Sequence, residues 1–433
     1  MNRSPLLVIF VTVFIDLVGF GIVIPVLPYY LESPRFQATP VALGFLFTSY
    51  SVMQLIFSPV LGRLSDRHGR RPVLLLSLIG TGLGFLIMGA ATTLWMLFAG
   101  RILDGVTGGN ISTAQAYIAD VTTPENRAKG MGMFGAAFGL GFIFGPAIGG
   151  VLSGWDISAP FYFAAALAFA NAVLLYFTLP ETVTPDHPAR NVRRGWGYFF
   201  KQLKEPALGL VLVIYFFFVV SFSIMTTTFA YFTMYRFGYD AAHNGWLFAY
   251  VGLLAVVVQG GLIGRLVKRF GEMRLVVAGA VLLTVNLFIL PFVGPVWGGL
   301  TALMLVMTGF SLGNSLATPS LTSLASRGAD AAEQGGVLGV TQSAASLARA
   351  VGPVVGGLLI YSATAPRHLD DRSLRATFWA AAGIMFAALV VALYLKRAHA
   401  SRYSAGASNA APRPETSTRA PDVKVDKPAG PVI

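Results

Sequence analysis

The sequence contains no cysteine and few charged residues, and both shortages limit what the protein can be. Without cysteine the chain has no disulfide framework and no thiolate metal site. Asp, Glu, Lys and Arg together form 12% of the 433 residues, whereas a water-soluble globular chain carries about 25%. Most of the surface must therefore face something other than water.

Motifs of ATP-driven proteins and of metalloenzymes are also missing. No Gly-Lys-Ser or Gly-Lys-Thr phosphate-binding loop occurs in the chain, so we expect that ATP does not drive it. The histidines are scattered along the sequence, at His68, His187, His243, His368 and His399. We predict that the protein is not an enzyme and that it has no cofactor and no metal site.

Long apolar runs fill the chain instead, and 55% of the residues are hydrophobic. The runs are about 20 residues long, the length a helix needs to cross about 30 Å of hydrocarbon. The predicted spans are 5–27, 41–61, 72–91, 94–120, 130–152, 159–180, 206–232, 243–265, 274–293, 296–324, 334–362 and 373–396. We therefore predict an all-α membrane protein with twelve transmembrane helices, the first of them retained and not a cleaved signal peptide.

The chain divides at one long polar connection. Residues 1–180 form the predicted first six-helix half, residues 181–205 a cytoplasmic linker, and residues 206–397 the second half. Residues 398–433 are rich in Ala, Pro, Ser and Lys with almost no large apolar residue, so we expect a disordered cytoplasmic tail.

The two halves repeat each other in sequence. The motif Gly-Pro-Ala-Ile-Gly-Gly at 145–150 recurs as Gly-Pro-Val-Val-Gly-Gly at 352–357, 207 residues later. Gly-Arg-Leu at 62–64 recurs at 264–266, 202 residues later. Two unrelated motifs with nearly the same offset predict two six-helix pseudo-repeats, with a substrate held near the midplane between them.

The net charge of +12 is distributed unevenly across the predicted membrane. Of the 31 lysines and arginines, 24 lie on the side of the two termini and five on the opposite side, while Arg101 and Arg349 lie within spans. Positive residues collect on the cytoplasmic side of membrane proteins. We therefore expect a multi-pass protein of the inner (plasma) membrane with both termini cytoplasmic and with no nucleic-acid partner.

Several motifs then point to one family. The loop after the second span reads Gly-Arg-Leu-Ser-Asp-Arg-His-Gly-Arg-Arg-Pro over 62–72 and resembles the signature of the major facilitator superfamily. Asp16 in the first span, Arg101 with Gly105 in the fourth, and the Gly-Pro-rich fifth span resemble the drug/proton antiporter branch. Asp120, followed by Pro124 and Arg127, is similar to the tetracycline exporters.

Two features depart from that resemblance. Tetracycline exporters carry membrane carboxylates in the third and ninth spans, whereas residues 73–91 and 275–293 contain no Asp or Glu. This argues against a magnesium–tetracycline chelate as the substrate. The fourth span also has Asp104 where the family motif usually has Gln.

The resemblance implies a conformational latch at the cytoplasmic ends of the helices. Its residues would be Gly62, Asp66, Arg67, Gly69, Arg70, Arg71, Asp120 and Arg127. Asp66 would pair with Arg70 or Arg127 and hold the halves together in the outward-open state. The alternative is a solvated loop that only sets topology.

Four ionisable residues lie within predicted spans: Asp16, Arg101, Asp104 and Arg349. A charge at the bilayer centre costs at least about 3 kcal/mol on insertion scales, so such residues face a partner or water. We hypothesise that Asp16 pairs with Arg101 when ionised and is released on protonation, which would couple protons to transport. Asp104 is the second candidate proton carrier, and a static buried ion pair is the structural alternative.

Further residues are assigned to a hinge and to substrate binding. The resemblance makes the fifth span a closely packed hinge, with Gly139, Gly145, Pro146 and Gly149; ordinary glycine packing is the alternative. Candidate substrate contacts are Asn110, Gln115, Phe222, Met225, Thr226, Asn314 and Arg349. Arg349 would bind an anionic part of the substrate or an acid across the halves, or serve a structural role on backbone carbonyls.

These observations favour a proton-coupled exporter of small lipophilic compounds that works by alternating access. Its partners would be the substrate, protons and the lipid bilayer, and we expect a monomer. A proton-coupled transporter of a sugar or another metabolite on the same fold is the first alternative, because fold does not fix function. A membrane receptor that has lost transport is the second, and the intact Asp16, Asp66 and Arg101 argue against it.

Overall fold

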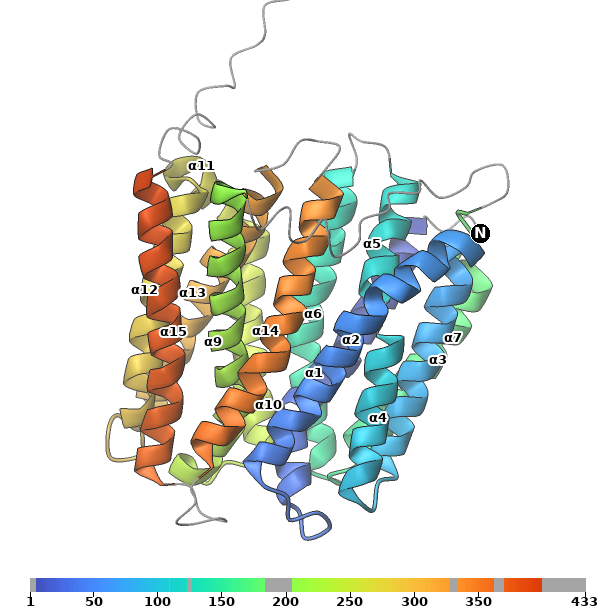
Figure 1. The fold of residues 1–433 in the computed structure, drawn as a ribbon. Helices are drawn as coiled ribbons and strands as arrows, with labels where there is room; N and C mark the ends of the chain where they lie inside the picture. The colour runs from blue at the N-terminus through green and yellow to red at the C-terminus, as the bar shows by residue number, and fades with distance from the viewer. Residues whose placement is uncertain are drawn as a thin grey trace, which may run out of the picture.

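The computed structural model describes residues 5–108, 110–122, 127–183, 205–327, 334–361 and 370–398, and this part of the chain is helical (Figure 1). The first half contains α1 (Pro5–Glu32), α2 (Pro40–His68), α3 (Arg70–Gly89), α4 (Leu94–Thr107), α5 (Asn110–Val121), α6 (Arg127–Ser153) and α7 (Ala159–Thr178). The second half contains α9 (Pro206–Phe237), α10 (Ala241–Val257), α11 (Ile263–Phe270), α12 (Glu272–Ile289), α13 (Gly299–Arg327), α14 (Gln334–Ile360) and α15 (Asp371–Ala398). Most of the predicted linker, and the predicted tail beyond 398, lie outside the described residues.

These helices make the twelve predicted crossings. In the described part of the chain ten helices are long and apolar enough to span a membrane, and α6 and the α4–α5 pair supply the other two crossings. A π-helical turn, η1 (Val258–Leu262), joins α10 to α11 into one crossing, and a 3₁₀ turn, η2 (Leu290–Phe292), follows α12. The prediction of a twelve-helix, all-α membrane fold is confirmed.

The predicted fourth span is interrupted, which the apolar pattern did not indicate. Instead of one helix over 94–120, α4 ends at Thr107 and α5 begins at Asn110. Gly108 follows α4 and donates its backbone N–H to the carbonyl of Gly105. Glycine pays the largest entropy cost in a helix, so paired glycines at 108 and 109 favour a break here.

The two halves lie side by side, the first drawn in blue through cyan to pale green and the second in yellow-green to red (Figure 1). We call the side of the bundle where α1 begins and α15 ends the terminal face, and the opposite side the distal face. Contacts between the halves are made mainly by α6 against α10 and by α2 against α14. Smaller contacts join α1 to α9 and α10.

These two interfaces are copies of each other. A Cβ on Gly245 of α10 would lie 2.5 Å from the carbonyl oxygen of Pro146, and a Cβ on Gly44 of α2 would collide with the carbonyl of Pro353. Gly44 and Gly245 are 201 residues apart, and Pro146 and Pro353 are 207 apart. The pseudo-repeat predicted from the sequence is therefore also a repeat of contacts, in which small residues let helices approach closely.

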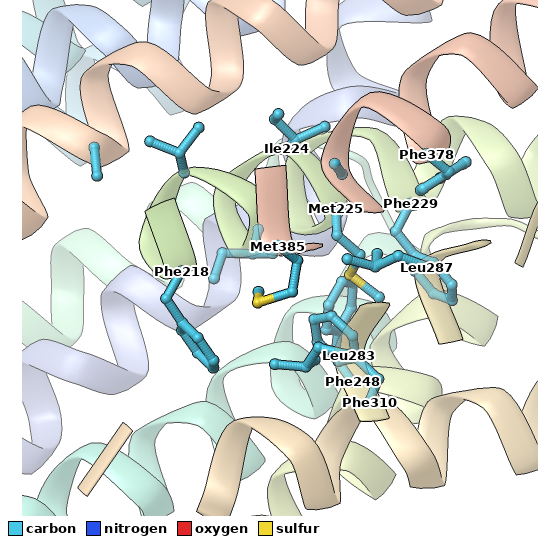
Figure 2. Close-up of a cluster of buried hydrophobic side chains, with 14 of the residues drawn as sticks. Phe218, Ile224, Met225, Phe229, Phe248, Leu283, Leu287, Phe310, Phe378 and Met385 are labelled. Carbon is cyan, nitrogen blue, oxygen red and sulfur yellow. The ribbon is translucent and has the colours of Figure 1, made fainter. Parts of the chain in front are cut away.

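The second half is built around an apolar core. Figure 2 shows side chains from α9, α10, α12, α13 and α15 packed on one another without a charged group among them. The residues labelled there are Phe218, Ile224, Met225, Phe229, Phe248, Leu283, Leu287, Phe310, Phe378 and Met385. Because this core holds its helices together without ionisable groups, the buried charges of the protein must be sought elsewhere.

Candidate functional site

A buried ion pair lies within the first half. Arg101 on α4 is 0% exposed, and its Nη1 atom lies 3.2 Å from Oδ2 of Asp104, one turn further along the same helix. The other carboxylate oxygen, Oδ1, accepts a hydrogen bond from the hydroxyl of Thr81 on α3 at 3.0 Å. Asp104 itself is 5% exposed. Both charges are therefore removed from water and compensate each other.

Two aromatic rings of α2 cover the guanidinium. The Cζ atom of Arg101 lies 4.3 Å from the ring centroid of Tyr50 and 5.6 Å from that of Phe47. A cation over an aromatic face is attracted by the ring quadrupole, more strongly where water is excluded. The Nε and Nη2 atoms of Arg101 are buried and have no hydrogen-bond partner among the described residues. The ring contacts thus take the place of hydrogen bonds.

Gln54 extends this cluster to the end of α4. Its Nε2 atom donates to the hydroxyl of Tyr50 at 3.0 Å and to the carbonyl oxygen of Gly108 at 3.1 Å. Gln54 thereby satisfies a carbonyl exposed by the break between α4 and α5. Sequence reasoning did not single out Tyr50, Gln54 or Thr81, although polar side chains inside apolar spans were the signal that could have found them.

Glycines bring the helices close enough for these contacts. A Cβ on Gly105 would lie 2.6 Å from the carbonyl oxygen of Tyr50, so α4 and α2 pack backbone to backbone. A Cβ on Gly84 of α3 would lie 2.8 Å from the carbonyl oxygen of Gly100. The ion pair is therefore positioned by α2, α3 and α4 together.

The hypothesis that paired Arg101 with Asp16 does not describe this conformation. The ion pair that the structure shows for Arg101 is with Asp104, because residues three apart on a helix lie on the same face. Asp16 lies half-buried on α1. The carboxylate that compensates Arg101 here belongs to Asp104, which the sequence analysis named only as the second candidate proton carrier.

A second charge network lies on the terminal face, at the predicted conformational latch. Arg70 contacts Asp66 through Nη1 at 2.5 Å and Asp120 through Nε at 3.0 Å, and it donates to the hydroxyl of Ser65 at 2.7 Å. Of the two partners predicted for Asp66, the structure shows Arg70. All of these partners belong to the first half.

Glu181 completes this network, and the sequence analysis missed it. Its two carboxylate oxygens accept the backbone N–H groups of Arg70 at 2.8 Å and Arg71 at 3.0 Å, at the start of α3. Gly69, with φ of +105°, makes the turn before them, and a Cβ there would collide with Glu181. An acid at a helix N-terminus also complements the helix dipole. The start of the 181–205 linker is thereby tied to the latch loop.

The remaining latch residues have varied surroundings. Arg67 is exposed, and a Cβ on Gly62 would meet no neighbour within 4 Å. The guanidinium of Arg71 lies 5.0 Å from the ring centroid of Tyr176 on α7. The side chain of Arg127 lies outside the described residues.

The predicted hinge residues line two close helix contacts. Gly145 and Gly149 face α1, where a Cβ would lie 2.7 Å from the carbonyl oxygen of Val18 and 2.9 Å from that of Ile22, respectively. Gly139 and the carbonyl of Pro146 face α10 in the other half, where a Cβ on Gly139 would lie 3.0 Å from a methyl group of Val256. Helix α6 therefore contacts both halves along its length.

The predicted substrate residues on α9 divide into two kinds. Met225 is 1% exposed and packs in the core of the second half (Figure 2). Phe222 is half-buried and stacks on Phe310 with ring centroids 5.5 Å apart, and the hydroxyl of Thr226 donates to the carbonyl of Phe222 at 3.0 Å. Only Phe222 and Thr226 therefore keep an accessible surface in this conformation.

The other predicted substrate residues lie on α5, α13 and α14. Gln115 is half-buried, Asn314 accepts a hydrogen bond from Thr318 at 3.0 Å, and the side chain of Asn110 lies outside the described residues. Arg349 is half-buried midway along α14, and its Nη2 atom donates to the hydroxyl of Ser346 at 3.1 Å. Within the described segments it makes no ion pair.

Comparison with known proteins identifies the family to which this chain belongs. The family described as Major Facilitator Superfamily matches residues 9–353 and 311–424. The chain belongs to the Major Facilitator Superfamily. It is 34% identical over 357 residues to the class D tetracycline resistance protein of Salmonella ordonez, covering 82% of this chain and 89% of that protein.

A second relative is similar in sequence, and a solved structure is similar in fold. Multidrug resistance protein 2 of Bacillus subtilis is 33% identical over 367 residues, covering 83% of this chain and 89% of that protein. The crystal structure of the nucleoside transporter NupG has a TM-score of 0.71 at 12% identity, covering 91% of this chain and 99% of the other. The chain is therefore a multi-pass membrane transporter of this superfamily with tetracycline and multidrug resistance proteins among its relatives.

Proposed function

We propose that this transporter exports small lipophilic compounds in exchange for protons, by alternating access between its two six-helix halves. The observation that carries the proposal is the Arg101–Asp104 pair, a carboxylate 5% exposed and held by a cation that is 0% exposed. Ionisable residues inside membrane spans mark ion pathways and proton relays.

Protonation of Asp104 would remove the negative charge that compensates Arg101. A buried charge that loses its partner is strongly destabilised, by about 3–5 kcal/mol when the partner is removed outright. Arg101 has no second hydrogen-bonded partner among the described residues. The cation would then favour a conformation in which it meets water or another acid, and Asp16 on the neighbouring α1 is the acid we assign to that role. The two carboxylates would thus compete for one guanidinium.

Proton uptake and substrate release would be linked through this competition. A ligand shifts a conformational equilibrium only by its differential affinity for the two states. A lipophilic compound bound between the halves would favour one state, and the proton on Asp104 or Asp16 the other. In this cycle residues 1–180 and 206–397 move as two bodies, and Glu181 anchors the start of the 181–205 linker to the first.

The side chains available for binding favour an apolar substrate. Phe222, which is half-buried, presents an aromatic ring that stacks on the buried ring of Phe310. Neither α3 nor residues 275–293 carry an acid that could hold a metal chelate. The tetracycline and multidrug resistance relatives are almost equally similar, so we rest the choice of a lipophilic substrate on these side chains. Arg349, without an ion pair among the described residues, would accept an anionic substituent.

The distribution of basic residues determines the direction of transport that we propose. With 24 of 31 basic residues on the side of the termini, the terminal face would be cytoplasmic and the membrane the plasma membrane. The described halves contact each other toward the distal face, so this conformation would receive substrate from the cytoplasm.

The test is proton-driven efflux in proteoliposomes that contain the purified chain. We expect Asp104→Asn and Asp16→Asn each to abolish efflux driven by a pH gradient, while compound binding is retained. Asp156→Asn is the matched control, because Asp156 lies in the distal loop before α7. Hydrogen bonds from the hydroxyl and then the backbone N–H of Ser158 hold the pKa of that carboxyl below its usual range, so it stays ionised throughout the assay. Full proton-driven efflux in both single variants would contradict the proposal.

A further inference from the structure

Hydrogen bonds at the distal ends of α1, α9 and α10 cross from one half to the other. Tyr29 on α1 donates its hydroxyl proton to the backbone carbonyl of Tyr239 at 3.0 Å. The same hydroxyl accepts a hydrogen bond from Nδ2 of Asn244 on α10. Asn244 is 0% exposed. One tyrosine of the first half is therefore bound by two groups of the second.

The second half holds both of these groups in place. The Asn244 amide exchanges hydrogen bonds with the hydroxyl of Thr233 at 2.7 and 2.9 Å. The Tyr239 carbonyl lies in the short connection between α9 and α10. Gly238 closes α9 in the left-handed region with φ of +66°, and the Asp240 carboxylate caps the start of α10. Both partners of Tyr29 are thus fixed before the halves meet.

Each half is also tied together at its distal end by an arginine. In the first half Arg35 donates to the carbonyl of Ala91, which follows α3, at 3.2 Å. In the second half Arg236 donates to the carbonyl of Pro291, which follows α12, at 3.0 Å, and pairs with Asp371 at 3.0 Å. Arg35 and Arg236 are 201 residues apart, the offset of the repeat. Separation at the distal face would therefore break the bonds of Tyr29 before those within a half.

We propose that Tyr29 is the gate residue of the distal face, acting with Thr233, Tyr239 and Asn244 as the distal gate. The distal gate keeps the halves together in this conformation and opens when substrate leaves toward the distal side. Its members are neutral, whereas the network of Asp66, Arg70 and Asp120 on the terminal face is charged. The hydrogen bonds of the distal gate therefore include no charged side chain, although the ionisable pair of Asp240 and His243 flanks the Tyr239 carbonyl.

The gate is weak enough to open in each cycle. On opening, both partners of each hydrogen bond become hydrated. One bond therefore changes the equilibrium between the closed and the open distal face by a factor of about twofold to tenfold. Loss of the Tyr29 hydroxyl removes two such bonds. We expect Tyr29→Phe to raise the equilibrium constant for opening at the distal face by about tenfold. The Asn244 amide stays hydrogen-bonded in this variant, because it keeps its bonds to Thr233.

The absence of native cysteine makes this shift directly measurable. Spin labels at Thr92→Cys and Val296→Cys report the distal separation of the halves, since both positions are exposed in distal loops of different halves. Labels at His68→Cys and Arg269→Cys report the terminal face in the same way. With Tyr29→Phe in the reconstituted full chain, the distal distance distribution should gain a longer component and the terminal one a shorter component.

Tyr30→Phe is the matched control. The Tyr30 hydroxyl donates to the carbonyl of Met88 at 3.1 Å, which is within the first half, so its loss should leave both distance distributions as in the parent chain. Tyr239→Phe is a second control, because Tyr239 contributes only its backbone carbonyl. An unchanged distal distribution in Tyr29→Phe, or the same change in Tyr30→Phe, would overturn the proposal. These distances report conformation without transport, so either result leaves the proton-exchange proposal to its own test.

Discussion

The fourth crossing of the first half and its counterpart in the second half share a backbone plan but differ in charge. At an offset of 206 residues the buried positions of α4 and α13 coincide, so Arg101 corresponds to Met307, which is 0% exposed, and Asp104 to Phe310, which is 3% exposed. Phe310 stacks on Phe222 of α9 with ring centroids 5.5 Å apart, where Asp104 takes part in an ion pair. The two halves thus share their helix packing, and the buried ion pair lies in the first half.

The latch loops show the same difference. In the second copy Lys268 stands at the position of Asp66 and Glu272 at that of Arg70. Glu272 accepts a hydrogen bond from Ser323 at 3.0 Å, whereas Arg70 binds two carboxylates. Gly69 and Gly271 nevertheless share a positive φ, of 105° and 80°. The fold of each loop needs the glycine, and the charge network is an addition to the first half.

The largest effect is expected when the first half loses its buried cation. Arg101→Leu places an apolar side chain where the second half has the buried Met307, and it leaves Asp104 buried without its cation. We expect a loss of about 3–5 kcal/mol in stability, because an uncompensated buried charge is costly. Thermal unfolding in detergent, followed by fluorescence, measures it.

The double variant Arg101→Leu with Asp104→Thr sharpens this comparison. It leaves the first half without charge at both positions, as in the second half, so most of the lost stability should return while proton-driven efflux stays absent. If the double variant were as unstable as Arg101→Leu alone, the ion pair would have a packing role that the neutral pair cannot replace.

A smaller and symmetric effect is expected at the two crossings between the halves. Gly44→Ala and Gly245→Ala each place a Cβ against the backbone carbonyl of a proline, Pro353 or Pro146. Overpacking of this kind costs about 1–3 kcal/mol, and the two losses should be equal if the crossings are equivalent. Melting temperatures of the two variants measure the comparison directly.

Gly383→Ala on α15 serves as the control for helix propensity. A Cβ there meets nothing within 4 Å, so alanine should be neutral or stabilise the helix by up to about 1 kcal/mol. A loss at Gly44 without a loss at Gly245 would show that the two interfaces differ in energy although they look alike.

A still smaller effect is expected at the cap of α3. Glu181→Ala removes the acceptor of two backbone N–H groups, so we expect a loss of about 1 kcal/mol in stability. Glu181→Gln keeps one acceptor oxygen and should lose less. The two variants compared by thermal unfolding distinguish a capping role from a purely electrostatic one, which would give equal losses.

The smallest effect on transport is expected at Met225→Leu. Met225 packs in the apolar core of the second half, and exchange of Met for Leu keeps its volume, with a stability loss under about 1.5 kcal/mol. The efflux rate and the range of compounds should be unchanged, whereas Phe222→Ala should alter them. Efflux assays with a panel of lipophilic dyes test this, and a changed range in Met225→Leu would return that residue to the binding site.

Most of the fold followed from the sequence because the bilayer imposes a single length scale. The prediction for the sixth span, 159–180, differs from α7 by two residues, since both ends lie at polar segments. The first span was predicted to end at 27, but α1 continues to Glu32 past Pro25 and Pro28. Hydropathy reports the apolar part of a helix and not its full length.

The partners within the site were less predictable, for physical reasons. Arg101 lies three residues from Asp104 and at a depth comparable to Asp16, so the sequence left both pairings possible and packing decides between them. Tyr29 and Asn244 sit at helix ends, where polar aromatic residues commonly serve as interface anchors. Their bond depends on how the halves meet, and no local pattern encodes that.

The π-helical turn between α10 and α11 explains a small irregularity in the repeat. Before it the two halves are offset by 201 residues, as at Gly44 and Gly245, and after it by 202, as at Gly69 and Gly271. A π turn accommodates one additional residue within a helix. The second half therefore carries a single-residue insertion that its helix absorbed as a local widening.

That insertion has a mechanical consequence. In a regular α-helix one extra residue would rotate everything beyond it by about 100° around the helix axis. The wide turn takes up this residue, so α11 remains the counterpart of the end of α2. Deleting Gly260 or Gly261, whose Cβ positions are unobstructed, would remove the insertion and restore a regular α-helical turn. The turn thus records how a duplicated chain can take up one residue without disturbing the packing on either side.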